Sequence, residues 1–338
     1  MFNQNPSKSH VVKYVTLGKT GLKVSRLCIG CMSFGGPTSE GFEWTLDYDH
    51  SKEVIDKAID LGINFFDTAD VYSGGKSEEI VGRALEGRRN DVVIATKVGL
   101  PSGKGPGNRG LGRKHVFQSL RKSLRHLRTD RLDLYQIHRW DYDTPIDDVL
   151  KILTDIVRRD GAADHVGASS MWAWQFAKAL DTSKAMNLVR FETMQNHYNL
   201  VYREEEREMI PLCVEEGIAL MPWSPLARGF LTGRYKRNKK PTSLRYRKDG
   251  LMRERFFKQE DYDVVERLVE VAKEEGAKPA QVALAWVLGK KGVKAPIVGP
   301  TSPGQLEELV EAVDIRLAPN QAKRLEEPYK PHAVLGHL

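Results

Sequence analysis

Four polar residues occur at or just past the ends of successive apolar segments, and together they could transfer a proton. Asp67 ends one segment, Tyr72 lies five residues beyond it, and Lys97 and His138 end the next two. A tyrosine pKa of about 10 falls beside an ammonium group, which stabilises the phenolate. A buried lysine keeps its charge beside a carboxylate such as Asp67, and a histidine can orient a carbonyl. Together these four residues could donate a proton to a carbonyl oxygen that becomes negative when a hydride reaches its carbon.

Each residue alone also has an ordinary structural explanation. Asp67 could form a turn or cap a helix, because aspartate readily bonds nearby backbone amides. Lys97 could extend its charged end to solvent, and His138 could be a hydrogen-bonded structural histidine. Their placement at the ends of three successive segments favours the catalytic interpretation.

The elements that must position these residues alternate regularly between apolar strands and amphipathic helices. The expected strands are Arg26 to Gly30, Asn64 to Phe66, Val92 to Lys97, Leu132 to His138, His165 to Ala168, Glu192 to Gln195, Ile218 to Pro222 and Ala295 to Val298. The expected helices are Lys52 to Leu61, Ser77 to Leu85, Arg113 to Leu127, Ile146 to Arg158, Met171 to Leu180, Glu204 to Glu215, Asp261 to Glu275 and Pro279 to Leu288. Eight β-then-α units favour an α/β fold, a closed (β/α)₈ TIM barrel.

Segments outside this alternation predict an additional hairpin and two functional loops. Val12 to Leu17 and Leu22 to Val24 flank a Gly-rich turn and predict a β-hairpin over the N-terminal mouth of the barrel. The long connections Gly99 to Gly112 and Arg228 to Glu260 follow barrel strands, which places them on the active-site face. We expect one barrel domain over residues 1–338, with residues 1–11 as a flexible extension.

Charge and composition argue against nucleic acid and membranes as binding partners. The net charge is +7 and the pI is about 9.1, but the basic residues are spread over many segments, so we expect a solvated surface and no nucleic acid. The longest apolar stretch, Val282 to Leu288, is far shorter than the roughly 20 residues that cross a bilayer. Since residues 1–10 also lack a signal pattern, we expect a cytoplasmic protein that does not bind membranes.

Cysteine spacing gives no metal or disulfide framework. Cys28 and Cys31 have the C-x-x-C spacing of zinc and redox motifs, but no second Cys or His pair accompanies them at ligand spacing. We therefore expect no metal site.

Three segments resemble signatures of the aldo-keto reductase superfamily, and the resemblance extends from about Val12 to Leu335. They are Asp67-Thr68-Ala69-Asp70-Val71-Tyr72-Ser73 with Ser77-Glu78-Glu79 and Gly82, then Ala95-Thr96-Lys97, then Gln136-Ile137-His138-Arg139. The resemblance implies that Tyr72 is the general acid/base, that Lys97 and Asp67 lower its pKa, and that His138 positions the carbonyl. It also implies NADP(H) as cofactor, a small-molecule carbonyl substrate, and reduction of aldehydes or ketones to alcohols.

The same resemblance implies which residues hold the cofactor. The nicotinamide end would be held by Ser169, Ser170, Gln195 and Trp223, the last by stacking on the ring. The phosphates would be held by Leu226, Arg228, Gly229, Arg234 and Arg245, with Arg245 at the 2′-phosphate. The adenosine end would be held by Gly299, Thr301, Gln305 and Glu308, while Leu309 replaces a common asparagine. Further expected cofactor contacts are Gly30, Cys31, Met32, Asp67, Ser224 and Pro225.

For the substrate we expect an aromatic wall made of Phe34, Trp140, Tyr142 and Trp172. Such a wall suits sugars, aryl aldehydes and aliphatic ketones alike, so the sequence leaves the substrate open, as it does the oligomeric state.

Two other readings remain. The stretch Gln195 to Leu200, with Pro222 to Gly229, most resembles a bacterial and archaeal branch near the potassium-channel β subunits. This makes a slow, cofactor-sensing regulatory subunit the first alternative. The second is another barrel enzyme, such as a phosphate-binding isomerase or a metal-dependent hydrolase.

Overall fold

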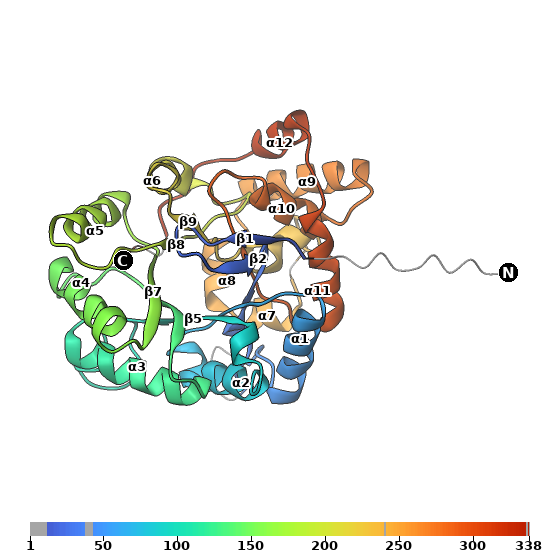
Figure 1. The fold of residues 1–338 in the computed structure, drawn as a ribbon. Helices are drawn as coiled ribbons and strands as arrows, with labels where there is room; N and C mark the ends of the chain where they lie inside the picture. The colour runs from blue at the N-terminus through green and yellow to red at the C-terminus, as the bar shows by residue number, and fades with distance from the viewer. Residues whose placement is uncertain (1–11, 38–42, 240, 336, 338) are drawn as a thin grey trace.

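The chain forms a parallel eight-stranded barrel with helices around it (Figure 1). The computed structural model describes residues 12–37, 43–239, 241–335 and 337, so the expected flexible extension, 1–11, lies outside the described residues. The barrel strands are β3 (Cys28–Gly30), β4 (Phe65–Asp67), β5 (Val93–Val98), β6 (Leu132–Ile137), β7 (Ala163–Ser169), β8 (Thr193–Gln195), β9 (Ala219–Leu220) and β10 (Ile297–Val298). Each pairs in parallel with its neighbour in the order β10-β3-β4-β5-β6-β7-β8-β9.

The first and last strands of this order meet and close the barrel. Isolated parallel bridges join Leu220 to Val293 and Trp223 to Ile297. The Ile297 amide also donates a hydrogen bond of 2.8 Å to the carbonyl of Pro222. Closure leaves no free sheet edge and confirms the predicted (β/α)₈ barrel.

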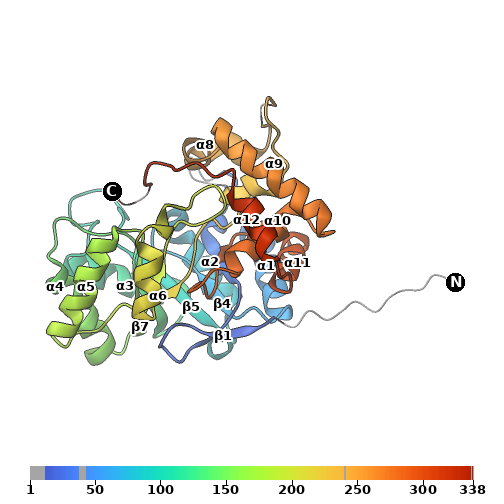
Figure 2. The same cartoon turned by 90° about the horizontal axis from the view of Figure 1, so that it is seen from above.

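Helices surround the barrel (Figure 2), most of them on its outer face and two short ones at one of its mouths. They are α1 (Tyr48–Asp60), α2 (Lys76–Ala84), α3 (Arg113–Leu127), α4 (Ile146–Thr154), α5 (Ala173–Ala185), α6 (Met209–Glu216), α7 (Leu244–Lys248), α8 (Gly250–Arg255), α9 (Gln259–Glu274), α10 (Pro279–Leu288), α11 (Pro303–Val310) and α12 (Pro319–Glu326). No helix within the described ranges is long and apolar enough to cross a membrane.

The structure adds helices that the apolar periodicity did not predict. Helices α7 and α8 form inside the connection expected to be an open loop, and each is capped by a side chain, Ser243 for α7 and Asp249 for α8. Both are too short to show a helical repeat. Helix α11 has a visible signal in Ser302 followed by Pro303, a capping residue before a first-turn proline.

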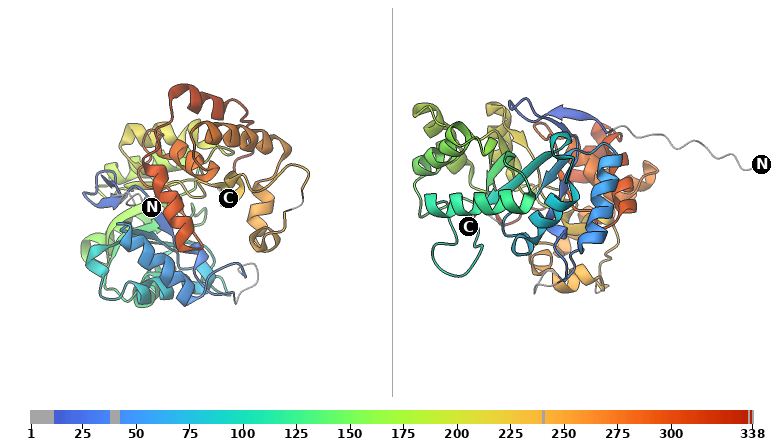
Figure 3. Two further views of the ribbon diagram at one scale, coloured as in Figure 1. Left: turned by 90° about the vertical axis from the view of Figure 1, so that its right-hand side faces the viewer. Right: turned by 60° about the horizontal axis from the view of Figure 1, so that its bottom comes forward.

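An antiparallel hairpin, β1 (Tyr14–Thr16) and β2 (Lys23–Ser25), closes one mouth of the barrel. Leu17 and Val24 are fully buried against residues of the barrel interior such as Phe65. The Tyr14 hydroxyl donates to the carbonyl of Gly62, which precedes β4. This confirms the hairpin that the sequence predicts. In Figure 3 the hairpin and the α7–α8 segment lie at opposite ends of the barrel, so the mouth beside α7 and α8 is the one left for a site.

Candidate active site

A buried ion pair lies at the carboxyl ends of β4 and β5. The Lys97 Nζ atom donates to Asp67 Oδ2 at 2.5 Å and to the Thr68 carbonyl at 2.7 Å. The exposed fraction of the Lys97 side chain is 0% and that of Asp67 is 2%. Burial disfavours the charge of Lys97, but Asp67 and Tyr72 outweigh it and raise the lysine pKa, so Lys97 stays charged.

The loop after β4 carries Tyr72 to this ion pair. The amides of Thr68 and Asp70 donate to the carbonyls of Ala95 and Lys97 at 2.9 and 3.2 Å, so the loop follows the end of β5. Lys97 Nζ lies 5.0 Å from the centre of the Tyr72 ring. The His138 ring meets Tyr72 edge to face, with 5.8 Å between the ring centres. The structure therefore brings all four predicted catalytic residues together.

The electrostatics of the phenol differ from the expectation in one respect. Burial raises the pKa of Tyr72, Lys97 opposes that rise, and the resulting pKa lies above the usual value of 10.0. The ammonium of Lys97 alone would lower the pKa of the phenol, but the loss of water and the charge of Asp67 both act against it. Tyr72 is consequently protonated at neutral pH.

His138 is a neutral imidazole in this setting. Burial, together with the charges of Arg139 and Lys97, lowers its pKa well below 6.5. It can thus offer a hydrogen bond without adding a third positive charge to the site.

Two glutamines donate hydrogen bonds to the second oxygen of Asp67. Of these, Gln195 was predicted as a site residue and Gln136 was not. Asp67 Oδ1 accepts hydrogen bonds from Gln136 Nε2 at 2.9 Å and from Gln195 Nε2 at 2.8 Å. Gln195 Nε2 also lies 3.2 Å from Gln136 Oε1. Gln136 has a sequence signal, because it lies two residues before His138 on one strand and so faces the same side. Its amide fixes the orientation of the carboxylate.

A cavity of about 1040 Å³ opens beside Tyr72, His138 and Asp67. Most of the residues expected to hold a cofactor line it: Gly30, Met32, Asp67, Ser169, Gln195, Trp223, Ser224, Pro225, Leu226, Arg228, Gly229, Arg234, Arg245, Gly299, Thr301, Gln305 and Glu308, together with Leu309. Cys31 and Ser170, which were also expected to contact the cofactor, are buried and do not line the cavity. The Cys31 thiol points to the Ile29 carbonyl, and Ser170 Oγ accepts from Trp223 Nε1 at 3.0 Å.

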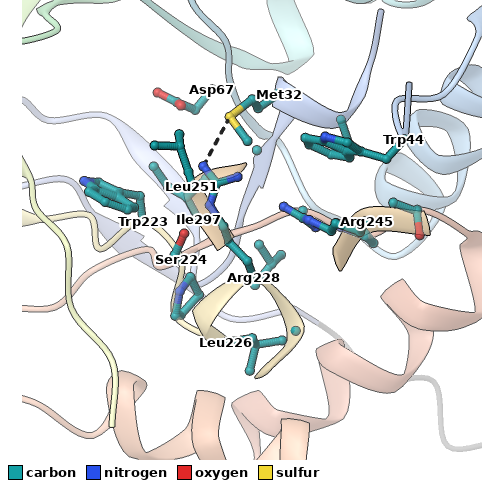
Figure 4. A pocket seen from close by; sticks show the side chains of 18 of the residues that line it. Met32, Trp44, Asp67, Trp223, Ser224, Leu226, Arg228, Arg245, Leu251 and Ile297 are labelled. Carbon is teal, nitrogen blue, oxygen red and sulfur yellow. Dashed lines mark hydrogen bonds between the residues drawn. The ribbon is translucent and has the colours of Figure 1, made fainter. Parts of the chain in front are cut away.

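Two of the arginines that line the cavity, Arg228 and Arg245, share a single carboxylate. Figure 4 shows both side chains. Arg228 forms an ion pair with Asp249 Oδ2, and Arg245 Nε lies 3.4 Å from the same oxygen. Arg245 also lies over the Trp44 ring, 4.3 Å from its centre. Burial, followed by the charge of Arg228, lowers the pKa of Arg245 to about 10, so Arg245 remains charged at neutral pH. The excess positive charge suits a phosphate.

The four aromatic residues expected to form a substrate wall do not line this cavity. Phe34 is fully buried in the core, and Trp140 packs against Trp174. The C-terminal segment meets the other two, since Trp172 contacts the His337 ring and the Tyr142 hydroxyl lies 3.5 Å from the His337 carbonyl. Substrate contact by these residues stays a prediction. Other side chains line the wall instead, among them Trp44, Leu100, Pro101, Arg139, Tyr235, Leu251 and Arg255.

The two cysteines at C-x-x-C spacing are free thiols within the core. Burial and the charge of Asp67 raise the pKa of both Cys28 and Cys31 well above 9.0. Among the described residues, no group of three or more His, Cys, Asp or Glu side chains is arranged to hold a metal ion.

Comparison with known proteins gives consistent matches across the chain. The protein-family model "Aldo/keto reductase family" matches residues 26–330. Versiconal hemiacetal acetate reductase of Aspergillus parasiticus is 39% identical, over 96% of this chain and 98% of that protein. An aldo-keto reductase of Metarhizium robertsii is 36% identical, over 96% and 93%. A putative aryl-alcohol dehydrogenase of Schizosaccharomyces pombe is 37% identical, over 96% and 98%. The expected position near the potassium-channel β subunits is not addressed by these matches and stays a prediction.

The buried ion pair predicts a specific pattern of stability. Lys97→Met should lower the free energy of unfolding by about 3 to 5 kcal/mol, because it leaves the Asp67 carboxylate buried without its cation. Asp67→Asn in the same chain should restore part of that loss, since it removes the unpaired charge. Urea denaturation of both variants measures this. A double variant no more stable than Lys97→Met would contradict the account.

Proposed function

Because the chain belongs to the aldo/keto reductase family, we propose that it is an NADPH-dependent oxidoreductase that reduces aldehydes or ketones to alcohols, with Tyr72 as proton donor. The observation that carries this proposal is the Tyr72 phenol, which lies at the cavity wall beside a lysine kept charged by a buried carboxylate. The printed names of the relatives, reductases and a dehydrogenase, agree with redox chemistry on a carbonyl or an alcohol.

The cavity fits a nicotinamide dinucleotide in size and in lining. Its volume of about 1040 Å³ is at the upper end of typical ligand sites. Trp223 offers an aromatic wall beside Ser224, and Arg228 with Arg245 offers two guanidinium groups for phosphates. The Nε atom of Arg228 is buried without a hydrogen-bond partner among the described residues, which is unfavourable unless an anion binds there.

In the proposed reaction the carbonyl oxygen lies between Tyr72 and His138. A bound reduced nicotinamide would supply the hydride that the carbonyl carbon accepts. Tyr72 gives its phenolic proton to the oxygen as negative charge develops there. Lys97 stabilises the remaining phenolate, while Asp67 keeps Lys97 charged. His138, as a neutral imidazole, positions the oxygen by a hydrogen bond.

The Gln136–Asp67–Gln195 network gives Gln195 a defined orientation. Its Nε2 group is committed to Asp67, so its Oε1 atom is the end left to accept a hydrogen bond. We propose that this oxygen accepts a hydrogen bond from the carboxamide N–H of the nicotinamide. Ser169 would lie next to the same carboxamide. Ser169 Oγ already donates to the Gln195 carbonyl at 2.9 Å, which holds the two residues together.

The regulatory alternative has less support. Channel β subunits often lack the histidine of the catalytic set, whereas here His138 lies beside Tyr72. No observation favours a sensor, and we therefore do not propose it.

Tyr72→Phe should leave NADPH binding intact and remove detectable turnover, because the substitution deletes only the transferable proton. His138→Asn should retain measurable turnover, at a cost of about 2 to 4 kcal/mol in the activation free energy. Stopped-flow oxidation of NADPH by an excess of aldehyde measures both rates. Tyr14→Phe, which removes a phenol at the opposite barrel mouth, is the control. Wild-type rates in Tyr72→Phe would refute Tyr72 as the donor.

Arg245→Met should raise the dissociation constant of NADPH by roughly tenfold or more, because a charge-assisted contact with the 2′-phosphate is lost. The dissociation constant of NADH, which lacks this phosphate, should change little. Quenching of tryptophan fluorescence on titration measures both constants. An unchanged affinity for NADPH would remove Arg245 from the phosphate site.

A further inference from the structure

A column of three nearly parallel aromatic rings ends at the wall of the cavity. The His197 imidazole lies face to face with the Trp223 indole, with 4.1 Å between ring centres and 7° between planes. The Tyr202 ring lies against the same imidazole at 4.1 Å and 14°, and at this distance the two rings must cover its opposite faces. Trp223 lines the cavity, whereas His197 and Tyr202 are each 1% exposed and do not line it. The imidazole therefore supports the indole from behind.

The segment that follows β8 builds this column by turning back on itself. The amides of Asn199 and Tyr202 each donate to the carbonyl of the other at 3.1 Å. This tight turn brings Tyr202 over His197. A parallel bridge joins His197 to Trp223, and the Trp223 amide donates to the Asn196 carbonyl at 2.9 Å. Backbone pairing thus fixes which rings meet.

The orientation of the Trp223 indole depends on its edge and on its rear face. The indole Nε1 donates to Ser170 Oγ at 3.0 Å, which fixes the ring within its own plane. Tilt of that plane is opposed by the imidazole of His197 on the rear face. Arg255 lines the cavity on the other side, and its guanidinium carbon lies 5.2 Å from the centre of the indole. A guanidinium on a flexible side chain does not fix the plane of the indole, whereas the packed imidazole does.

The rear of the column is closely packed and neutral. The Leu335 amide donates to the Tyr202 hydroxyl at 3.0 Å, and the Phe256 ring meets His197 edge to face at 5.8 Å. Burial, followed by the charges of nearby arginines, lowers the pKa of His197 well below 6.5, and burial raises the pKa of Tyr202. Both rings are consequently uncharged at neutral pH. They add no positive charge behind a nicotinamide ring, which is itself positive once it has lost its hydride.

The plane of the indole matters because hydride transfer depends on alignment. A nicotinamide ring stacked on Trp223 takes its plane from the indole, and that plane sets the direction in which the hydride leaves. A displacement of about 1 Å in a reacting group can lower a rate on the order of a hundredfold.

We propose that His197, with Tyr202 behind it, is a positioning residue that holds Trp223 in the plane on which the nicotinamide ring stacks. This inference rests on the proposed function, because it takes Trp223 as the stacking partner of the cofactor. His197 acts through Trp223 and touches neither cofactor nor substrate. Loss of its flat ring therefore affects the nicotinamide half of the cofactor and spares the adenosine half.

The test compares His197→Leu with His197→Phe. Both variants lose the imidazole nitrogens, including Nε2, which lies 3.3 Å from Asn199 Nδ2, but only the second keeps a flat ring. Both also remove Nδ1, a buried nitrogen without a hydrogen-bond partner in the part of the chain that the structure describes. Replacing such a group by an apolar side chain of similar size should leave the protein folded.

His197→Leu should raise the dissociation constant of NADPH about threefold to tenfold, because the stacking surface is no longer held in place. The dissociation constant of 2′-phospho-ADP-ribose, which lacks the nicotinamide, should not change. At saturating NADPH the single-turnover rate of reduction of pentanal, a simple neutral aldehyde, should fall about tenfold to a hundredfold. His197→Phe should restore both quantities towards wild type. Titration calorimetry measures the two constants, and stopped flow measures the rate.

His115→Leu is the matched control. His115 is a buried histidine of α3 that does not line the cavity, and its Nε2 atom also has no partner among the described residues. This variant should keep the wild-type affinity for both ligands and the wild-type rate.

Three results would overturn the positioning role. If His197→Leu weakens the binding of both ligands equally, His197 supports the cavity as a whole and not the nicotinamide site. If His197→Phe is as impaired as His197→Leu, the flat ring is not the feature that matters. If both variants bind and react like wild type, the positioning role is wrong while the reductase activity stands.

Failure of the proposed function gives a different pattern. If the wild-type protein binds NADPH with the expected difference between the Leu and Phe variants, yet reduces no aldehyde, the proposed function fails and the role of His197 stands. If NADPH does not bind at all, both fail.

Discussion

The charged side chain of Lys97, which has no exposed surface, is the constraint on which the active site depends. A lysine in such a place loses its charge unless a carboxylate compensates the loss of water. Asp67 provides that carboxylate, and Gln136 and Gln195 in turn occupy its second oxygen. Lys97, Asp67, Gln136 and Gln195 are thus one hydrogen-bonded unit, and Tyr72 lies against it with its ring centre 5.0 Å from Lys97 Nζ. Any substitution within it changes the environment of Tyr72.

The barrel makes this unit possible because parallel strands end on the same side. In the sheet register Asp67 lies beside Ala95, and Lys97 lies beside Gln136. The β1–β2 hairpin closes the opposite mouth with apolar side chains, so polar chemistry is confined to one end. At that end five arginines line the cavity: Arg139, Arg228, Arg234, Arg245 and Arg255.

Local sequence was sufficient for the strands and for the polar residues that meet at their ends, and insufficient for contacts made over long sequence distances. Each barrel strand is a short apolar segment, and Asp67, Lys97 and His138 lie at or directly after the ends of such segments, so period and position placed them at one mouth of the barrel. Asp249 was missed because its role depends on Arg228, which is distant in sequence and meets it only through α7 and α8. The four aromatic residues expected around the substrate make contacts that no local pattern reports: Phe34 packs in the core, Trp140 packs on Trp174, and Trp172 and Tyr142 meet His337. Burial, which raises the pKa of Tyr72, likewise exists only in the folded chain.

The pH dependence of single-turnover reduction of pentanal by NADPH, followed by stopped flow, tests most directly whether Tyr72 is the proton donor. Because the pKa of Tyr72 is raised, the phenol keeps its proton at neutral pH. We therefore predict a rate constant that is unchanged from about pH 6 to pH 9 and falls only above about pH 10. A rate that falls as the pH rises through about 7 would contradict the account and point to Asp70, whose pKa burial and Glu78 raise to about 7. A rate that rises only on acidification below pH 6 would instead identify His138 as the acid.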